Sequence, residues 1–330
     1  MTAPLTYTHE ARFEDDVVAM LCRHGWDEVL DRPTERQLIE NWAEILYNNN
    51  RDQDRLGDVP LTSTEMDQII EQITELRTPL LLNEFINGRS VAITRDAPEA
   101  HNLGKEVSLK IYDRREIAGG QSCYQIARQP KFSTAAHKLM PERRGDLMLL
   151  INGMPVIHLE LKRSGVPVSQ ATNQIIKYAH EGVFTGLFSL VQIFVGMTPT
   201  ETQYFANPGP GGKFNPDFFF NWADFNNEPI NDWPAVVTSL LSIPMAHQLI
   251  GFYTVTDRAA GVLMVMRSYQ YFAAHRIADR VESHEWGSDN KGGYIWHTTG
   301  SGKTITSFKT AQLIACLLYT SDAADDTPCV

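Results

Sequence analysis

Three ionisable residues beside an Asn-Gly pair have types and spacing that could do hydrolytic chemistry. Asp146 opens one apolar stretch, and Glu160 and Lys162 lie near the end of the next. Residues two apart in a strand point to the same face, so Glu160 and Lys162 share a face. Asn152-Gly153 between the stretches is a strong hairpin signal. The hairpin would place Asp146 across from the other two, so that two carboxylates and one ammonium converge at a sheet edge.

Such a cluster suits phosphodiester hydrolysis. Carboxylate oxygens are hard ligands that bind Mg²⁺ while leaving it several waters. The ion polarises the phosphate and lowers the pKa of a bound water. Lys162 could orient that water or stabilise the negative charge that develops. The alternative is a surface ion pair of Lys162 with Glu160 or Asp146, because the pattern Asp…Glu-x-Lys is short and common.

A helix is predicted after the hairpin, over about residues 169–181. Gln174 and Tyr178 stand four apart in it and therefore share one face beside the hairpin. Other charged residues surround the motif and could grip phosphates or lie in solvent: Arg143, Arg144, Arg163 and Lys177. Glu84, in an earlier helix, is either a further acid of the site or a solvated charge.

A second motif, "HTTGSGKT", ends at Thr304 and predicts a phosphate-binding loop between a strand (292–297) and a helix. The residues expected to hold the nucleotide are Thr299, Gly300, Ser301, Gly302, Lys303 and Thr304. Lys303 would reach the β- and γ-phosphates, and the Thr304 hydroxyl would bind Mg²⁺. Upstream, Gln270 could read adenine with an amide that donates and accepts; Gln248 is the second choice. The general phosphate-loop pattern is Gly-x-x-x-x-Gly-Lys-Ser/Thr. His297 stands at the position of its first glycine.

The elements around these motifs indicate an α/β fold. The first ~80 residues carry three amphipathic helical patterns, over 9–26, 34–47 and 62–79. Alternating and buried strand patterns begin near residue 91, so we expect a mixed sheet flanked by helices. We place a first domain over 1–245 and the start of a RecA-like P-loop domain over 246–316.

Composition restricts the class of protein. The chain has 330 residues and a net charge of −11, so any nucleic-acid contact must rest on local basic patches or on a basic partner. Its four cysteines are scattered, without the spacing of a zinc site or disulfide framework. We expect no signal peptide, no membrane contact and a cytoplasmic location.

"RRGDLMLLINGMPVIHLELK", followed by Gln174 and Tyr178, resembles the PD-(D/E)xK nuclease domain of the restriction (R) subunit of type I restriction enzymes. The Gln-x-x-x-Tyr on the following helix is a mark of that family. Gly145 stands where the general motif has proline. The resemblance implies a restriction-endonuclease-like fold, with Asp146 and Glu160 as metal ligands, Lys162 as the catalytic lysine, and Gln174 and Tyr178 shaping the DNA-facing side.

"YQYFAAHRI" and "GGYIWHTTGSGKT" resemble the entrance to the superfamily 2 motor of the same subunit. The resemblance thus runs from about residue 10 to residue 318. It implies a type I site-specific deoxyribonuclease that uses ATP to move double-stranded DNA and Mg²⁺ to cut it away from the recognition site. The implied partners are the methylation (M) and specificity (S) subunits, which find the site.

Two alternatives remain at this point: an ATP-dependent nuclease-helicase of another class, such as a type III restriction or repair enzyme, and a non-catalytic nucleotide-binding or scaffold protein. A C-terminal docking domain in the full-length sequence would favour type I. We also expect the motor to be incomplete, because the acids after Thr304 are Asp322, Asp325 and Asp326, in a stretch without a strand pattern. Residues 317–330 are expected to be a non-native tail.

Overall fold

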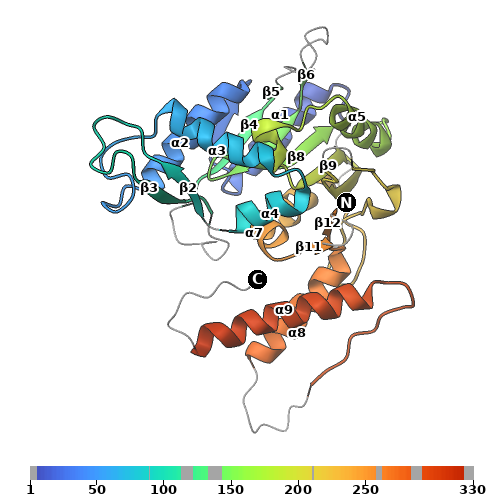
Figure 1. Ribbon diagram of the computed structural model, residues 1–330. Helices are drawn as coiled ribbons and strands as arrows, with labels where there is room; N and C mark the ends of the chain where they lie inside the picture. Colours follow the sequence, from blue (N-terminus) through green and yellow to red (C-terminus); the bar gives the residue numbers. More distant parts are fainter. Residues whose placement is uncertain are drawn as a thin grey trace.

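A six-stranded mixed sheet forms the centre of the computed structural model, which describes residues 6–88, 90–112, 122–132, 143–209, 212–257, 262–283 and 292–322 (Figure 1). The strands, in their order across the sheet, are β1 (Glu28–Asp31), β4 (Tyr124–Arg128), β7 (Leu147–Ile151), β8 (Met154–Leu161), β9 (Ile193–Thr198) and β10 (Glu201–Ala206). The β1–β4 and β8–β9 pairs are parallel and the other neighbours are antiparallel. The expected mixed sheet is confirmed.

Helices flank this sheet. They are α1 (Glu10–Arg23), α2 (Glu35–Asn49), α3 (Ser63–Glu75), α4 (Pro79–Asn87) and α5 (Val168–His180). Thr34 and Thr62 begin α2 and α3 with capping boxes, in which side chain and backbone satisfy each other's hydrogen bonds. The three N-terminal helices and the helix after the hairpin therefore lie where the sequence predicts them.

The β7–β8 hairpin lies at the centre of the sheet, and its register shifts by one residue between Leu149 and Leu150. Asn152 and Gly153 have φ values of 51° and 82°, the left-handed pair that a tight two-residue hairpin needs. A Cβ at Gly153 would lie 2.9 Å from Cα of Trp42, so α2 packs directly on the turn. Every residue of both strands is buried. The hairpin therefore forms a rigid floor for the residues at its open end.

Smaller elements surround the central sheet. They are the strand pairs β2 (Ser90–Thr94) with β3 (Glu106–Lys110), β5 (Lys131–Phe132) with β6 (Arg143–Arg144), and β11 (Thr254–Asp257) with β12 (Val262–Val265), the short 3₁₀ turns η1 (Gly186–Leu190) and η2 (Pro216–Phe218), and the helices α6 (Trp233–Ser239) and α7 (Ile243–Gly251). Helix α7 crosses the predicted domain junction at 245. Its His247 contacts the hydroxyls of Tyr112 and Tyr124, at 3.0 and 2.9 Å. Helix α7 is thus joined to the first domain, and the boundary stays a prediction.

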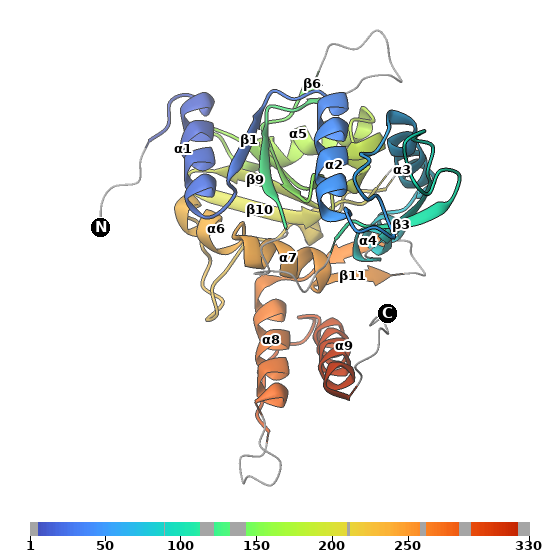
Figure 2. The same ribbon diagram turned by 90° about the vertical axis from the view of Figure 1, so that its left-hand side faces the viewer.

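Two helices, α8 (Ser268–Glu282) and α9 (Lys303–Asp322), lie side by side and project from the sheet-bearing body (Figures 1 and 2). Both were expected. The strand expected over 292–297 is wrong: the described residues from Gly292 to Thr298 form no strand. A strand exists only through hydrogen bonds to a neighbour, and no described segment pairs with this one. The RecA-like domain therefore stays a prediction. Helix α9 continues past residue 317, where the non-native tail was predicted to begin. Residues 323–330 of that predicted tail lie outside the described part of the chain.

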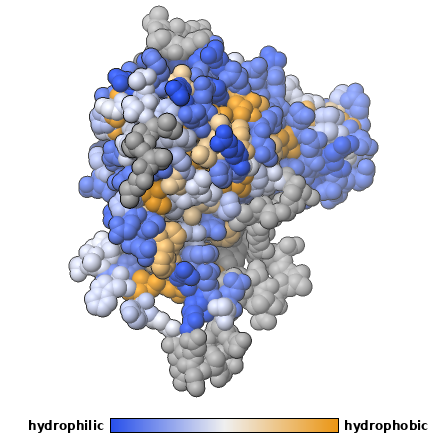
Figure 3. All heavy atoms as spheres, turned by 180° about the vertical axis from the view of Figure 1, so that it is seen from behind, coloured by the Kyte–Doolittle hydropathy of each residue, from blue (hydrophilic) through white to orange (hydrophobic). Residues whose placement is uncertain are grey.

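Within the described residues, no single helix is long and apolar enough to cross a membrane. Helices α6 and α7 meet the length and composition criteria only as a pair, which is bent by 62°. Both place side chains such as Val236, Val237 and Leu249 in the core. The face of the molecule in Figure 3 is mainly hydrophilic, with separate apolar patches.

Candidate functional site

Asp146, Glu160 and Lys162, which we call the carboxylate cluster, come together at the open end of the β7–β8 hairpin. Asp146 immediately precedes β7, and its Oδ2 accepts a hydrogen bond of 2.7 Å from the backbone N–H of Leu161. The Lys162 ammonium donates to Oε1 of Glu160 at 3.3 Å and to the Leu161 carbonyl at 2.9 Å. The structure therefore brings together all three residues that the spacing predicted to converge.

The cluster is short of positive charge. Glu160 is fully buried and Lys162 is 8% exposed. Burial raises the pKa of Glu160 to about 7. Burial, and next the charge of Glu160, raise the pKa of Asp146 well above its ordinary value. One ammonium thus faces two carboxyls that cannot both ionise easily, and a further cation would relieve the repulsion.

The donor set fits a hard divalent cation. Oε2 of Glu160 is buried without a hydrogen-bond partner among the described residues, so it is available as a ligand. No group of three or more His, Cys, Asp or Glu side chains in the described part of the chain is arranged so that it could hold a metal ion by itself. Two carboxylates, with water filling the other positions, is the arrangement typical of Mg²⁺ and unlike a structural zinc site.

We expect Glu160→Gln to stabilise the metal-free chain at high pH. A raised pKa means that wild type loses stability as pH rises from about 4.5 to about 7, because Glu160 must then ionise while buried. Glutamine has no such ionisation, although it weakens the contact with Lys162. The gain at pH 8 should be roughly 1–3 kcal/mol, or a few degrees in melting temperature, and should vanish near pH 4.5.

The measurement is thermal unfolding in EDTA at both pH values, with Glu71→Gln on the exposed face of α3 as the matched control. If the difference in melting temperature between Glu160→Gln and wild type does not change with pH, the raised pKa of Glu160 is contradicted.

Gly145 explains the departure from the proline of the general motif. A Cβ there would lie 2.6 Å from Cε1 of His158 and 2.9 Å from Cζ of Phe132. The N–H of Gly145 also donates to the Pro130 carbonyl at 3.2 Å, and proline has no such donor. Packing therefore requires glycine before Asp146, and the hydrogen bond excludes proline there.

Gly145→Ala should accordingly destabilise the chain by roughly 1–3 kcal/mol, the usual cost of overpacking a core. Gly293→Ala is the matched control, because a Cβ at Gly293 meets nothing within 4 Å. Chemical denaturation of both variants measures the difference. Equal stability of the two would show that the space at residue 145 is not restricted.

Gln174 and Tyr178 of α5 act on the strand that leads into Asp146. Gln174 Nε2 donates to the Tyr178 hydroxyl at 2.7 Å, and that hydroxyl donates to the carbonyl of Arg144 at 2.9 Å. Burial raises the pKa of Tyr178 to about 12, so the phenol keeps its proton. The pair fixes the backbone just before the carboxylate cluster. Its contact with DNA stays a prediction.

The basic residues near the cluster fall into two groups. Arg143 forms a bidentate ion pair with Glu181, at 2.8 and 2.9 Å. The Lys177 ammonium lies 4.0 Å from the same carboxylate. Arg144 and Arg163 are exposed, and their bonds reach only backbone carbonyls among the described residues. Arg144 and Arg163 are therefore better placed than Arg143 to bind a phosphate.

Two neighbours of the cluster were missed from the sequence. Glu10, at the start of α1, has Oε2 3.9 Å from the Lys162 ammonium. Its position in the first turn of an amphipathic helix is ordinary, so no local signal could have found it. His158 is the other and lies on the same strand face as Glu160. Glu84, which we considered as a further acid, lies exposed on α4.

The phosphate-loop residues lie at and just before the start of α9. Gly300 and Gly302 have φ values of 78° and 79°, which only glycine adopts without strain. Lys303 and Thr304 are exposed in the first turn of the helix, where backbone N–H groups favour an anion. The Lys303 ammonium donates to the Thr298 carbonyl at 2.9 Å. The loop thus offers the expected groups to solvent.

Gln270 is buried beneath this loop. Its Nε2 lies 3.2 and 3.4 Å from the carbonyls of Ser301 and Gly302, and its Oε1 accepts from the Arg267 N–H at 3.0 Å. A Cβ at Gly302 would lie 2.3 Å from Gln270 Nε2. Gln270 therefore supports the loop, and its contact with adenine stays a prediction. Gln248, the second choice, accepts from the Tyr271 hydroxyl at 2.6 Å.

A cleft of about 810 Å³ opens beside the loop. Aromatic side chains and two arginines, Arg267 and Arg276, line it, and its described lining includes no acidic side chain. A flat, anionic molecule fits this lining. The loop and the cleft adjoin each other, and nucleotide binding there stays a prediction.

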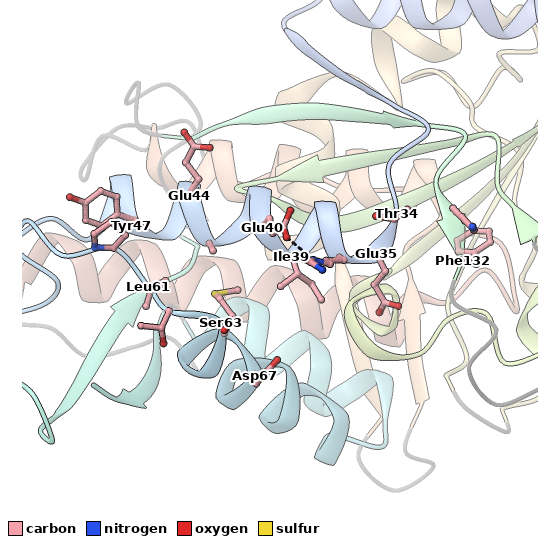
Figure 4. A pocket seen from close by; sticks show the side chains of 16 residues that line it. Thr34, Glu35, Ile39, Glu40, Glu44, Tyr47, Leu61, Ser63, Asp67 and Phe132 are labelled. Carbon is pink, nitrogen blue, oxygen red and sulfur yellow. Dashed lines mark hydrogen bonds and ion pairs between the residues drawn. The ribbon is translucent and has the colours of Figure 1, made fainter. Parts of the chain in front are cut away.

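A hollow of about 1060 Å³ lies between α2 and α3 (Figure 4). Its rim carries Glu40, Glu44 and Asp67, and none of the carboxylate cluster lines it. Glu35 in its wall accepts from the Leu187 N–H at 3.2 Å. Because the buried carboxyls and the ammonium are elsewhere, we place the chemistry at the carboxylate cluster and not in this groove.

Comparison with known proteins decides the family. Residues 7–213 match the family described as "Type I restriction enzyme R protein N terminus". This chain belongs to that family. Residues 269–323 match the SWI2/SNF2 ATPase family, and the two matched ranges contain the carboxylate cluster and the phosphate loop respectively.

Individual relatives agree with this membership in the R protein family. The EcoprrI endonuclease subunit of Escherichia coli is 35% identical over 289 residues, which is 84% of each chain. The SsaAORF53P endonuclease subunit of Staphylococcus saprophyticus is 31% identical over 94% of this chain, but this chain covers only 31% of that protein. The chain thus spans about a third of the length of its Staphylococcus relatives. The matches favour the type I interpretation over both alternatives.

Proposed function

We propose that this chain provides the nuclease centre and the entrance of the ATP-driven motor of a type I restriction enzyme, which cuts double-stranded DNA away from its recognition site. One observation carries the nuclease part: the buried Glu160 and the half-buried Asp146, both with raised pKa values, lie beside one ammonium at the end of a buried hairpin. An ordinary surface ion pair would be exposed, and its carboxylate pKa would not be raised.

Asp146 and Glu160 would hold Mg²⁺ in this centre. The bound ion would polarise the scissile phosphate and supply a water of lowered pKa. The Leu161 N–H fixes the Asp146 carboxylate by its 2.7 Å bond. The Lys162 ammonium lies 3.3 Å from Oε1 of Glu160, where it would stabilise charge that develops on the phosphate. The buried hairpin excludes water from beneath.

In the motor part, residues Thr299–Gly302 and Lys303 would wrap the phosphates of ATP, and Thr304 would bind its Mg²⁺. The relatives' names, as endonuclease subunits, support DNA as the substrate and the M and S subunits as partners. With a net charge of −11, DNA attraction would rest on local groups such as Arg144 and Arg163 and on those partners.

Cleavage of an unmethylated plasmid by the complete R subunit, assembled with its M and S subunits, tests this proposal. With Mg²⁺ and ATP we expect double-strand cuts that EDTA abolishes and that Asp146→Asn eliminates, while the exposed control Glu71→Gln leaves them unchanged. Cutting by the Asp146→Asn enzyme at the wild-type rate would contradict the proposed centre.

A further inference from the structure

His158 lies next to Glu160 in an unusual setting for a polar side chain. The imidazole is fully buried. Aromatic rings surround it, with ring centroids at 5.4 Å for Phe184, 6.1 Å for Phe132 and 6.2 Å for Phe194. Neither ring nitrogen has a hydrogen-bond partner among the described residues. A buried polar group without a partner is costly, so its presence here needs an explanation.

The atom that faces His158 is equally unpaired. Nε2 of His158 lies 3.5 Å from Oε2 of Glu160, and this oxygen is the one that lacks a partner. An imidazole always carries at least one N–H, so Nε2 can donate to this oxygen. The separation is longer than an ordinary hydrogen bond.

We propose that His158 is a positioning residue for the nuclease centre, whose Nε2–H holds Oε2 of Glu160 so that the carboxylate keeps the orientation needed to bind a divalent cation. This inference rests on the proposed function. His158 lies on the same strand face as Glu160 and beneath it, so it touches neither solvent nor a bound phosphate. Partners of this kind orient metal ligands and commonly change metal affinity by about 10–100-fold.

Gly145 makes this position possible. The Cβ that any other residue would place there lies 2.6 Å from Cε1 of the His158 ring. The residue before Asp146 and the histidine two residues before Glu160 are thus matched to each other. Glycine at 145 leaves the space, and the imidazole fills it with a donor aimed at Glu160.

The test is calorimetric titration of the 330-residue chain with Mn²⁺ at pH 8, for wild type, His158→Leu, His158→Gln and Glu160→Gln. Leucine has about the volume of the imidazole and no donor, whereas glutamine restores a donor. We expect His158→Leu to fold with an unreduced melting temperature and to bind Mn²⁺ about 10-fold more weakly, and His158→Gln to recover most of that loss. Glu160→Gln should show no binding at this site.

The outcomes separate this inference from the proposed function. If wild type and Glu160→Gln bind Mn²⁺ equally, the nuclease centre itself is wrong. If Glu160→Gln loses binding while His158→Leu binds like wild type, only the positioning role is wrong. If His158→Leu does not fold, His158→Gln decides: wild-type affinity supports the inference, and a 10-fold loss in a variant with a normal melting temperature overturns it.

Discussion

Replacing Lys162 by alanine should reduce DNA cleavage by the complete enzyme at least ~10³-fold and leave its ATP hydrolysis unchanged. Removing one well-placed electrostatic group commonly costs ~10²–10³ in rate. Here the loss is larger, because Lys162 supplies the ammonium that offsets the buried Glu160 carboxylate, at 3.3 Å. Without it, the two carboxyls at the end of the hairpin face each other with less compensation.

Plasmid cleavage and phosphate release, measured in the same reaction, provide the two readouts. Lys105→Ala is the matched control, because Lys105 is exposed in the turn between β2 and β3. Loss of both activities in Lys162→Ala would show that the nuclease and motor sites depend on each other. Unchanged cleavage would remove Lys162 from the reaction.

Replacing Lys303 by alanine should reduce ATP hydrolysis by the complete enzyme by ~10²–10³-fold, again the effect of removing one charged group from a phosphate site. Lys303 lies exposed at the start of α9, beside a loop whose two glycines have positive φ values. Its ammonium is held by the Thr298 carbonyl at 2.9 Å and can turn to a phosphate without unfolding the helix. ATP-dependent DNA cleavage should fall with it.

The assay is steady-state phosphate release with unmethylated DNA. The control is Asp146→Asn, which should lose DNA cleavage and retain ATP hydrolysis. Wild-type ATP turnover by Lys303→Ala would contradict the assignment of the loop.

The 330-residue chain alone should hydrolyse ATP negligibly, because the described lining of its nucleotide cleft includes no acid that could activate water.

Features that depend on local chemistry could be predicted from the sequence. Asn-Gly can adopt the left-handed conformations of a tight turn, so Asn152-Gly153 indicated the hairpin. The exact register was not indicated: the turn alone would set Asp146 opposite Leu159, and a register shift between Leu149 and Leu150 moves it opposite Glu160. The amphipathic patterns likewise predicted helices α1, α2 and α3, because helix periodicity is a property of the segment itself.

Features that depend on distant partners could not be predicted. Glu10 approaches Lys162 only after α1 packs against the sheet, and nothing near Glu10 in the sequence indicates this. The fit of Gly145 to the His158 ring is equally a result of packing. The strand predicted over 292–297 failed for the converse reason: its apolar pattern is local, but a strand needs a neighbour, and no described segment supplies one.

Anomalous diffraction from crystals of the chain soaked in Mn²⁺ tests the central claim most directly. The account predicts an anomalous peak within coordination distance of both the Asp146 and the Glu160 carboxylates, and no such peak in Glu160→Gln crystals soaked in the same way. A wild-type structure in which Mn²⁺ binds elsewhere, while Lys162 alone continues to pair with Glu160, would contradict the proposed nuclease centre.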